Sequence, residues 1–440
     1  MSAQNTSADI LRFAGDVNVE KAIITSLVSQ TKFNVANQLL SIIIYEDIFS
    51  PFITGTLVFR ESYDFVTNFP FVGEEVLELK VYTPTLNKTD NNSGIIEGKF
   101  YIYKMSDRTE VAERSMVYKL NFISLDAIAD INVKLSKAFS GKISEIAKQL
   151  LSSEDSLATK RPVTIEETRN KTKYISNFWS PIRNINYILE QAQNNAGSPT
   201  YVFFENRDGY NFVSLDYLNS GDLKQEFVYD NSQDDIFADG GSKRNIHRDY
   251  KRIYELNVPV SYDFMDKANS GTYASRLIFS DLATKEYFEL PYSFNDDWGA
   301  DQKQVRLNQY PLSSKKLLIN TNSKISNDVA YTFMFNDFQD VTNITSAQNR
   351  ISRIKQAQGQ RLNITVAGRT DYTVGQVVTV TVFKSEPTRE QDADSSQKDQ
   401  ILSGFYLISA INHSIDREKH ECHIELIKDS MTMDLNKGGA

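Results

Sequence analysis

The pair of apolar segments near the end of the chain, residues 401–428, constrains the fold most. A short charged stretch, Asp416-Arg417-Glu418-Lys419, separates two runs that are rich in β-branched and other apolar residues. Apolar and polar residues alternate in the second run, which predicts two faces of a strand: Cys422, Ile424 and Leu426 against Glu421, His423 and Glu425. The pattern predicts a half-buried β-hairpin, and we expect this hairpin to close a sheet.

The composition favours a β-rich protein with more than one domain. At 440 residues the chain exceeds the size of one ordinary core, and its 22 Tyr and 26 Phe residues are of the types that strands favour. A single cysteine, Cys422, excludes an internal disulfide. The first residues do not resemble a signal peptide and no apolar run is long enough to span a bilayer, so we expect synthesis in the cytoplasm and no stable membrane insertion.

The formal net charge of −9 argues against a protein that grips nucleic acid through its phosphates, because such proteins need a basic surface. We therefore expect no sequence-specific binding of nucleic acid. An acidic surface would let DNA slide past without sticking, although this charge balance is also common among ordinary soluble proteins.

Changes in pattern along the chain indicate its organisation. Short alternating strands with turns between them fill residues 22–125 and predict an antiparallel barrel or sandwich. Apolar residues then recur at helical spacing in residues 141–151, and Ser180-Pro181 supplies an N-cap and a first-turn proline for a second helix. The Asp-Gly turn at Asp208-Gly209 predicts a hairpin after these helices.

Motifs that would indicate catalysis are scarce. The chain has no Walker loop, no Gly-x-Ser-x-Gly elbow and no His-Glu-x-x-His sequence. Two acidic pairs, Asp234-Asp235 and Asp296-Asp297, would suit a glycosidase only if they faced each other across a cleft, and adjacent acids in polar segments are usually solvated. We predict that the chain is not an enzyme, with no catalytic or cofactor-binding residue.

A metal site at the terminal hairpin is a second chemical hypothesis. His413, His420, Cys422 and Asp416 carry imidazole, thiol and carboxylate groups, a combination that suits zinc. Strand alternation, however, places His420 and Cys422 on the face opposite His423. We favour Cys422 as a core residue and the histidines as polar strand positions, and therefore predict no metal site.

Several segments, taken in order, resemble the baseplate hub proteins of contractile-tailed bacteriophages, which are related to the spike and hub proteins of type VI secretion. The resemblance rests on residues 55–58 and 69–75; 118–124, 136–139 and 143–151; 174–181, 201–205 and 209–215; and 408–426. Residues 291–345 and 386–400 match nothing in that family.

The resemblance implies a mainly β (α+β) fold, with two antiparallel β-barrel, tube-like domains per chain, a small α+β domain between them and an inserted subdomain. The expected boundaries are 1–126 for the first barrel, 127–248 for the α+β domain with two helices and a hairpin, 249–290 with 346–430 for the second barrel, 291–345 for the insertion, and 431–440 for a polar tail.

It also implies a function in the virion. A homotrimer of such chains would form the central hub of the tail baseplate, adapt the threefold spike to the sixfold tail tube, and leave a channel for DNA passage. The expected partners are the tail spike protein, the tail tube or tube-initiator protein, the tape measure protein and the surrounding baseplate wedge proteins. No cofactor is expected. The alternatives are a tail-associated peptidoglycan hydrolase, suggested by the acidic pairs and aromatic residues, and the hub of a related contractile injection system.

Overall fold

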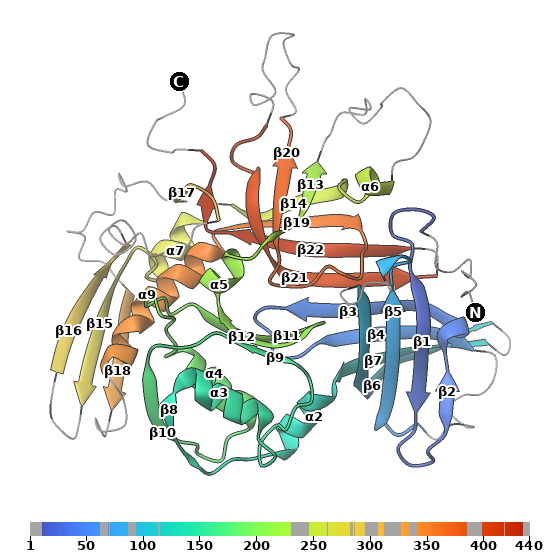
Figure 1. Ribbon diagram of the computed structural model, residues 1–440, viewed down its shortest axis with the longest axis horizontal. Coiled ribbons are helices and arrows are strands. Elements are labelled where there is room, and N and C mark those ends of the chain that lie inside the picture. Colours follow the sequence, from blue (N-terminus) through green and yellow to red (C-terminus); the bar gives the residue numbers. More distant parts are fainter. Residues whose placement is uncertain are drawn as a thin grey trace, which may run out of the picture.

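The computed structural model describes residues 11–61, 69, 71–86, 94–112, 115–229, 246–261, 263–281, 285, 287–294, 307–311, 327–333, 341–384, 398–417 and 419–433. The acidic pairs Asp234-Asp235 and Asp296-Asp297 lie outside these residues, as do most of 386–400 and 431–440. Within them the chain is mainly β, as predicted (Figure 1). No helix in this part of the chain is both long enough and apolar enough to cross a membrane.

Strands from both ends of the chain build one large sheet. The first β-rich part contributes β1 (Asn18–Thr25), β2 (Lys32–Asn34), β3 (Leu39–Asp47), β4 (Thr54–Glu61), β5 (Glu75–Tyr82), β6 (Ile95–Ala112) and β7 (Ser115–Ser124), with a 3-10 turn η2 (Ala36–Gln38). The second contributes β13 (Leu223–Tyr229), β14 (Ile253–Ser261), β19 (Gln360–Ala367), β20 (Val377–Val382), β21 (Gly404–Asp416) and β22 (His420–Lys428). The path through this 13-stranded sheet is β14-β19-β22-β21-β3-β4-β7-β6-β5-β1-β2, and β20 joins β13 to β21.

Strand β21 connects the two β-rich parts. Residues 404–407 pair with β20, residues 410–416 pair with β3, and β22 pairs along the other edge. The register with β22 shifts around Ser409, so the strand carries one extra residue where its neighbour changes from β20 to β3. Such a bulge bends a strand and increases its twist. The terminal hairpin therefore continues one sheet from the second part into the first (Figure 1).

The expected pair of closed barrels is not found. Among the described residues the path of the large sheet is open, and its two ends are β14 and β2. The second part does not close either: its strands run β14-β19-β22-β21-β20-β13, and among the described residues β13 pairs with the chain before β14 only at an isolated bridge between Val228 and Arg252. The sheet is also not purely antiparallel, since β13 and β20 run parallel.

The alternation predicted for the hairpin is confirmed. The exposed fraction is at most 1% for Cys422, Ile424 and Leu426, while His423 on the other face is exposed. Each β-rich part has its own apolar core, but the two cores exchange residues. Ile415 of β21 packs in the core of the first part, and Ile48, which follows β3, packs in the core of the second.

The small α+β part lies below the large sheet in Figure 1 and has a third core. It comprises α2 (Leu125–Asn132), β8 (Ala138–Lys142), α3 (Ile143–Ser152), β9 (Val163–Ile165), β10 (Lys171–Ile175), α4 (Pro181–Leu189), β11 (Tyr201–Asn206), β12 (Gly209–Ser214) and α5 (Leu215–Asn219). Both predicted helices are present. Ser180 caps α4 by accepting a hydrogen bond from Arg183 N, and the predicted turn joins β11 to β12, with Gly209 at a φ of 134°.

A separate small sheet lies at the side of the molecule, with one long helix beside it (Figure 1). Its strands are β15 (Ala274–Asp281), β16 (Tyr287–Ser293) and β18 (Asn327–Phe333), and the helix is α9 (Val341–Ala357). Shorter elements are α6 (Ile246–Asp249), α7 (Phe264–Asn269), β17 (Tyr310–Pro311) and β23 (Ser430–Met431). Strand β15, expected in the second barrel, pairs here with β18 of the expected insertion as well as with β16. The domain boundaries stay predictions.

Candidate functional site

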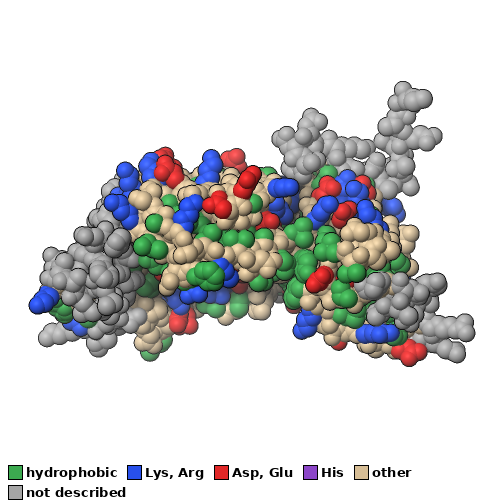
Figure 2. Space-filling view, turned by 90° about the horizontal axis from the view of Figure 1, so that it is seen from below, with side chains coloured by type: hydrophobic (Ala, Val, Ile, Leu, Met, Phe, Trp, Pro, Cys, Tyr) green, Lys and Arg blue, Asp and Glu red, His purple; other side chains and the backbone are tan. Residues whose placement is uncertain are grey.

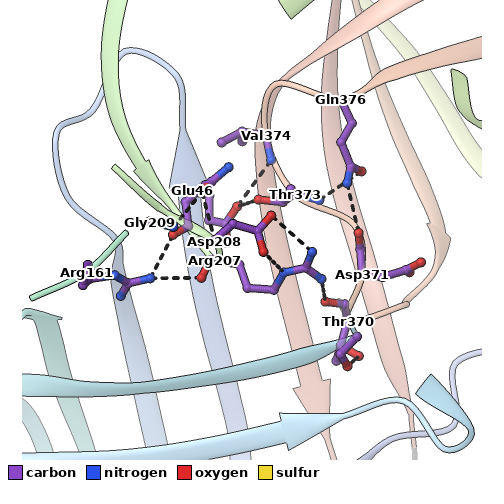
Figure 3. A network of polar contacts seen from close by, with 12 residues as sticks. Glu46, Arg161, Arg207, Asp208, Gly209, Thr370, Asp371, Thr373, Val374 and Gln376 are labelled. Carbon is purple, nitrogen blue, oxygen red and sulfur yellow. Dashed lines mark hydrogen bonds and ion pairs between the residues drawn. The ribbon is translucent and has the colours of Figure 1, made fainter. Parts of the chain in front are cut away.

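A buried polar junction holds the three parts of the chain together (Figure 3). Glu46 comes from β3, Arg207 from the turn between β11 and β12, and residues 370–376 from the loop between β19 and β20. Glu46 is 2% exposed and the side chain of Arg207 is 5% exposed. Burial of these charged groups requires partners, which only the assembled fold supplies.

The contacts in this junction fix the loop against β3. The carboxylate of Glu46 accepts hydrogen bonds from Thr373 Oγ1 at 2.5 Å and from Val374 N at 3.3 Å. Arg207 Nη1 donates to the carbonyl oxygen of Thr370 at 2.5 Å (Figure 3). Burial raises the pKa of Glu46, and the hydrogen bond from Thr373 and the positive charge of Arg207 oppose that shift. The groups satisfy one another, which is the arrangement of a structural contact.

A reciprocal pair of threonines anchors the same loop to the end of β5. Thr83 N donates to Thr370 Oγ1 at 2.8 Å, and Thr370 N donates to Thr83 Oγ1 at 3.0 Å. Thr370 Oγ1 also lies 2.6 Å from the carbonyl oxygen of Gly94, to which it donates. The loop between β19 and β20 therefore contacts the first β-rich part at Glu46, Thr83 and Gly94.

A second buried carboxylate, Glu205 of β11, links the small part to the first β-rich part. Its Oε2 accepts from Ile53 N at 3.0 Å, and its Oε1 accepts from Ser124 Oγ at 3.0 Å. Arg161 Nη1 lies 3.0 Å from the same Oε1. Burial raises the pKa of Glu205 to about 7, although Arg161 and the two hydrogen bonds act in the opposite direction. Catalytic acids show such shifts too, but here fixed protein donors occupy both oxygens.

Helix α9 contacts the small part through two arginines. Arg350 Nη1 donates to the carbonyl oxygens of Pro199 and Tyr201 at 2.7 and 2.9 Å. Arg353 forms an ion pair with Asp216 at 3.6 Å. Burial lowers the pKa of Arg350 to about 10. These contacts place the small outer sheet at a defined position beside the small part.

The hairpin brings three of the residues considered for a metal site into one buried cluster. His413 Nδ1 lies 3.0 Å from His420 Nε2, and Cys422 Sγ lies 3.3 and 3.5 Å from these two nitrogens. Asp416 is not part of this group. His423 is exposed on the opposite face, as alternation predicted, and contacts Thr365 Oγ1 at 3.1 Å. Strand alternation correctly predicted that His420 and Cys422 face away from His423. It did not predict that His413, His420 and Cys422 lie within hydrogen-bond distance of one another.

The exposed face of the large sheet has a hollow of about 480 Å³ that crosses β3, β14, β19, β21 and β22. Polar and apolar residues both line it, and no Lys or Arg is among the described residues that form it. The polar lining residues are Glu46, Asp47, Glu255, Glu425, Asn257, Asn363, Asn412, Tyr45, Thr365 and His423, and the apolar ones are Ile364, Ala410, Ile411 and Ile424. Burial and the negative charge of Glu425 raise the pKa of Asp47. On the side of the molecule shown in Figure 2, acidic and basic side chains are interspersed.

Comparison with known proteins finds similarity in structure but not in sequence. No protein-family model and no curated protein sequence matches the chain. The tail protein from Neisseria meningitidis MC58 superposes with a TM-score of 0.53 at 12% identity, over 93% of this chain and 96% of that one. The chain has a tail-protein fold.

A second solved structure agrees. The 43 kDa tail protein of prophage MuSo2 from Shewanella oneidensis has a TM-score of 0.52 at 8% identity, over 93% of this chain and 99% of that one. The likeness covers almost the whole length of both tail proteins, so the predicted resemblance to phage tail proteins is confirmed for the fold.

Proposed function

We propose that the chain is a structural protein of a phage tail, located at the centre of the baseplate as its hub. The observation that carries this proposal is the tail-protein fold, which extends over 93% of the chain. The buried junction supports it as well, because its charged groups are used to join the three parts of the chain. A hub transmits force between a tube and a spike, so a rigid connection between parts suits that task.

The open sheet supports a homotrimer. The main path ends at β14 and β2, and the edges of terminal strands need cover if they are not to pair with stray chains. Three copies around an axis would supply that cover and would present six β-rich parts. One side then matches a sixfold tail tube or tube-initiator protein, and the other a threefold spike. Tape measure and baseplate wedge proteins are further partners in this proposal.

The acidic hollow is, in this proposal, part of the wall of the DNA channel. Asp47, Glu425, Asn363 and Asn412 alternate with buried residues and lie on the face of the sheet that is turned away from both cores, whereas the carboxylate of Glu46 is buried in the junction. DNA carries one negative charge per phosphate, and the described residues that line the hollow include no Lys or Arg to pair with it. Arg361, which borders the hollow, is already paired with Glu425. The channel would pass DNA without retaining it.

The oligomeric state of the purified full-length chain tests the hub. Light scattering coupled to size exclusion is expected to give three times the chain mass of 50.1 kDa, and negative-stain images are expected to show rings with a central channel. The proposal is contradicted if the chain stays a compact monomer at every protein concentration up to its solubility limit. Digestion of purified peptidoglycan separates it from a hydrolase, for which fragment release would be required.

A further inference from the structure

The cluster of His413, His420 and Cys422 has the geometry of a metal site. His413 and Cys422 are directly opposite each other on β21 and β22, and His420 lies two residues from Cys422 on the same face. All three are buried, with exposures of 0%, 1% and 0%. The three donor atoms, Nδ1, Nε2 and Sγ, form a triangle with sides of 3.0, 3.3 and 3.5 Å.

This triangle has nearly the size that a zinc ion requires. With Zn–N near 2.0–2.1 Å and Zn–S near 2.3 Å, neighbouring donors of a tetrahedral site lie about 3.3–3.6 Å apart. The two sulfur to nitrogen distances are within or close to that range, and the distance between the nitrogens is slightly shorter. A small opening of the hairpin, which moves the two imidazole nitrogens apart, would be enough to accept the ion.

Hydrogen bonds alone satisfy the cluster poorly. A neutral imidazole has one N–H and one bare nitrogen, so the contact between the two rings fixes which ring donates. Either choice leaves one outer N–H and one outer lone pair. His420 Nδ1 is buried without a hydrogen-bond partner, and the backbone of Tyr372 offers a hydrogen bond to His413. A cation instead uses all three inner electron pairs at once. Burial lowers the pKa of both imidazoles, which keeps them in the neutral form that binds metals.

The surrounding backbone holds the His420 ring in place. A Cβ atom at Gly368 would lie 2.3 Å from Cγ of His420, so only glycine allows the chain after β19 to pass this close to the ring. Gly368 N donates to the carbonyl oxygen of His420 at 2.8 Å, and His420 N donates to that of Gly15 at 2.8 Å. These backbone contacts fix the position of the His420 ring.

We propose that His413 Nδ1, His420 Nε2 and Cys422 Sγ bind one Zn²⁺ ion that clamps the terminal hairpin beside its junction with β3. The donor set of two imidazoles and one thiolate suits this borderline-soft ion. Binding releases the thiol proton of Cys422, and the charge of the ion supplies the driving force. No fourth His, Cys, Asp or Glu among the described residues joins the group, so the fourth position falls to a water molecule or a backbone oxygen.

Metal content of the full-length chain is the first test. The protein is produced in zinc-supplemented medium, freed of any affinity tag and of loosely bound metal, and analysed by mass spectrometry of the element. We expect about one zinc per chain, and less than about a tenth of that in Cys422→Ser and His413→Ala. His423→Ala is the matched control, because His423 is on the same hairpin but on the exposed face, and it is expected to keep its zinc.

Binding of Co²⁺ to the wild-type chain tests the site without requiring that a variant fold. Titration of metal-free wild-type chain with Co²⁺ is expected to give the intense visible bands of tetrahedral cobalt and a near-ultraviolet band from thiolate to metal charge transfer. Folded wild-type chain that takes up less than about a tenth of an equivalent of either ion overturns the proposal. Uptake without the thiolate band, or uptake that persists unchanged in folded Cys422→Ser, places the metal elsewhere and overturns it equally.

Discussion

Single buried residues decide how the parts of this chain are joined. Glu46 and Glu205 are both nearly inaccessible, and each accepts hydrogen bonds from a different part of the molecule. A buried carboxylate that loses its hydrogen-bond partners still carries the cost of being removed from water. A fold with one part misplaced is therefore less stable by that cost as well as by the lost contacts. These residues therefore specify one relative arrangement of the parts.

Glu205 makes the stability of this arrangement depend on pH. Its pKa is about 7 in the folded chain, against an ordinary value of 4.5, so the folded chain binds more protons than the unfolded chain between these values. Its contribution to stability is therefore complete below pH 4.5 and is lost as the pH rises through 7. Glu205→Gln removes the titration. The stability of wild type relative to this variant is expected to fall by up to about 3 kcal/mol between about pH 5 and about pH 8.

Urea denaturation of both proteins at several pH values measures this difference. Glu167→Gln is the control, because Glu167 lies in the same part of the chain but is exposed and pairs with Lys142 at the surface. Its difference from wild type is expected to stay flat over the same pH range. A flat difference for Glu205→Gln as well would show that Glu205 does not titrate near neutrality.

At the scale of elements, strand β21 couples the two cores. Ile415 is fully buried in the core of the first part, although it lies at the end of a strand from the second part. Ile415→Ala is expected to lower the free energy of unfolding by about 2–4 kcal/mol, because it removes buried methyl groups and leaves a cavity. Since β21 also pairs with β20 and β22, we expect both β-rich parts to lose stability in the same transition.

Circular dichroism and limited proteolysis during denaturation test this coupling. Ser414→Ala is the control, because Ser414 is the preceding residue and is on the opposite face of the strand. It is expected to change the free energy of unfolding by less than about 0.5 kcal/mol. Two separate transitions, of which Ile415→Ala shifts only one, would contradict a shared fold.

Local patterns in the sequence predict local structure well here and long-range structure poorly. Apolar spacing gives α3 and α4, and alternation gives the faces of the terminal hairpin, because each depends on neighbours in the chain. Helix α9 is missed for a physical reason: its buried side is largely polar and carries Gln348, Ser352, Arg353 and Gln356, so no apolar stripe marks it. The pairing of β21 with β3 and the convergence of His413 with His420 depend on register, which no local signal reveals.

For the whole molecule, the distribution of charge matters more than the net value. The negative balance of the sequence suits a DNA channel only if the acidic groups lie on its wall. The hollow over β3, β14, β19, β21 and β22 has that character, since carboxylates and amides line it. Its exposed residues Glu255, Asn257 and Asn363 lie on the neighbouring strands β14 and β19 and are accessible to substitution without disturbing either core.

Lysines in this hollow are expected to make the assembled protein bind DNA. In a variant with Glu255→Lys, Asn257→Lys and Asn363→Lys, each new ammonium can pair with a phosphate and release counterions. We expect affinity for short duplex DNA to rise at least about tenfold over wild type at low salt, and to fall steeply as salt is added. Fluorescence anisotropy of labelled DNA measures this affinity on whichever oligomer light scattering identifies.

The control variant, Glu154→Lys with Asp155→Lys, changes the net charge by the same amount at exposed sites of the small part. Because charges that face a shared channel act together on one DNA molecule, the control is expected to gain much less affinity. Equal gains in both variants would show that the hollow is not the surface that DNA passes.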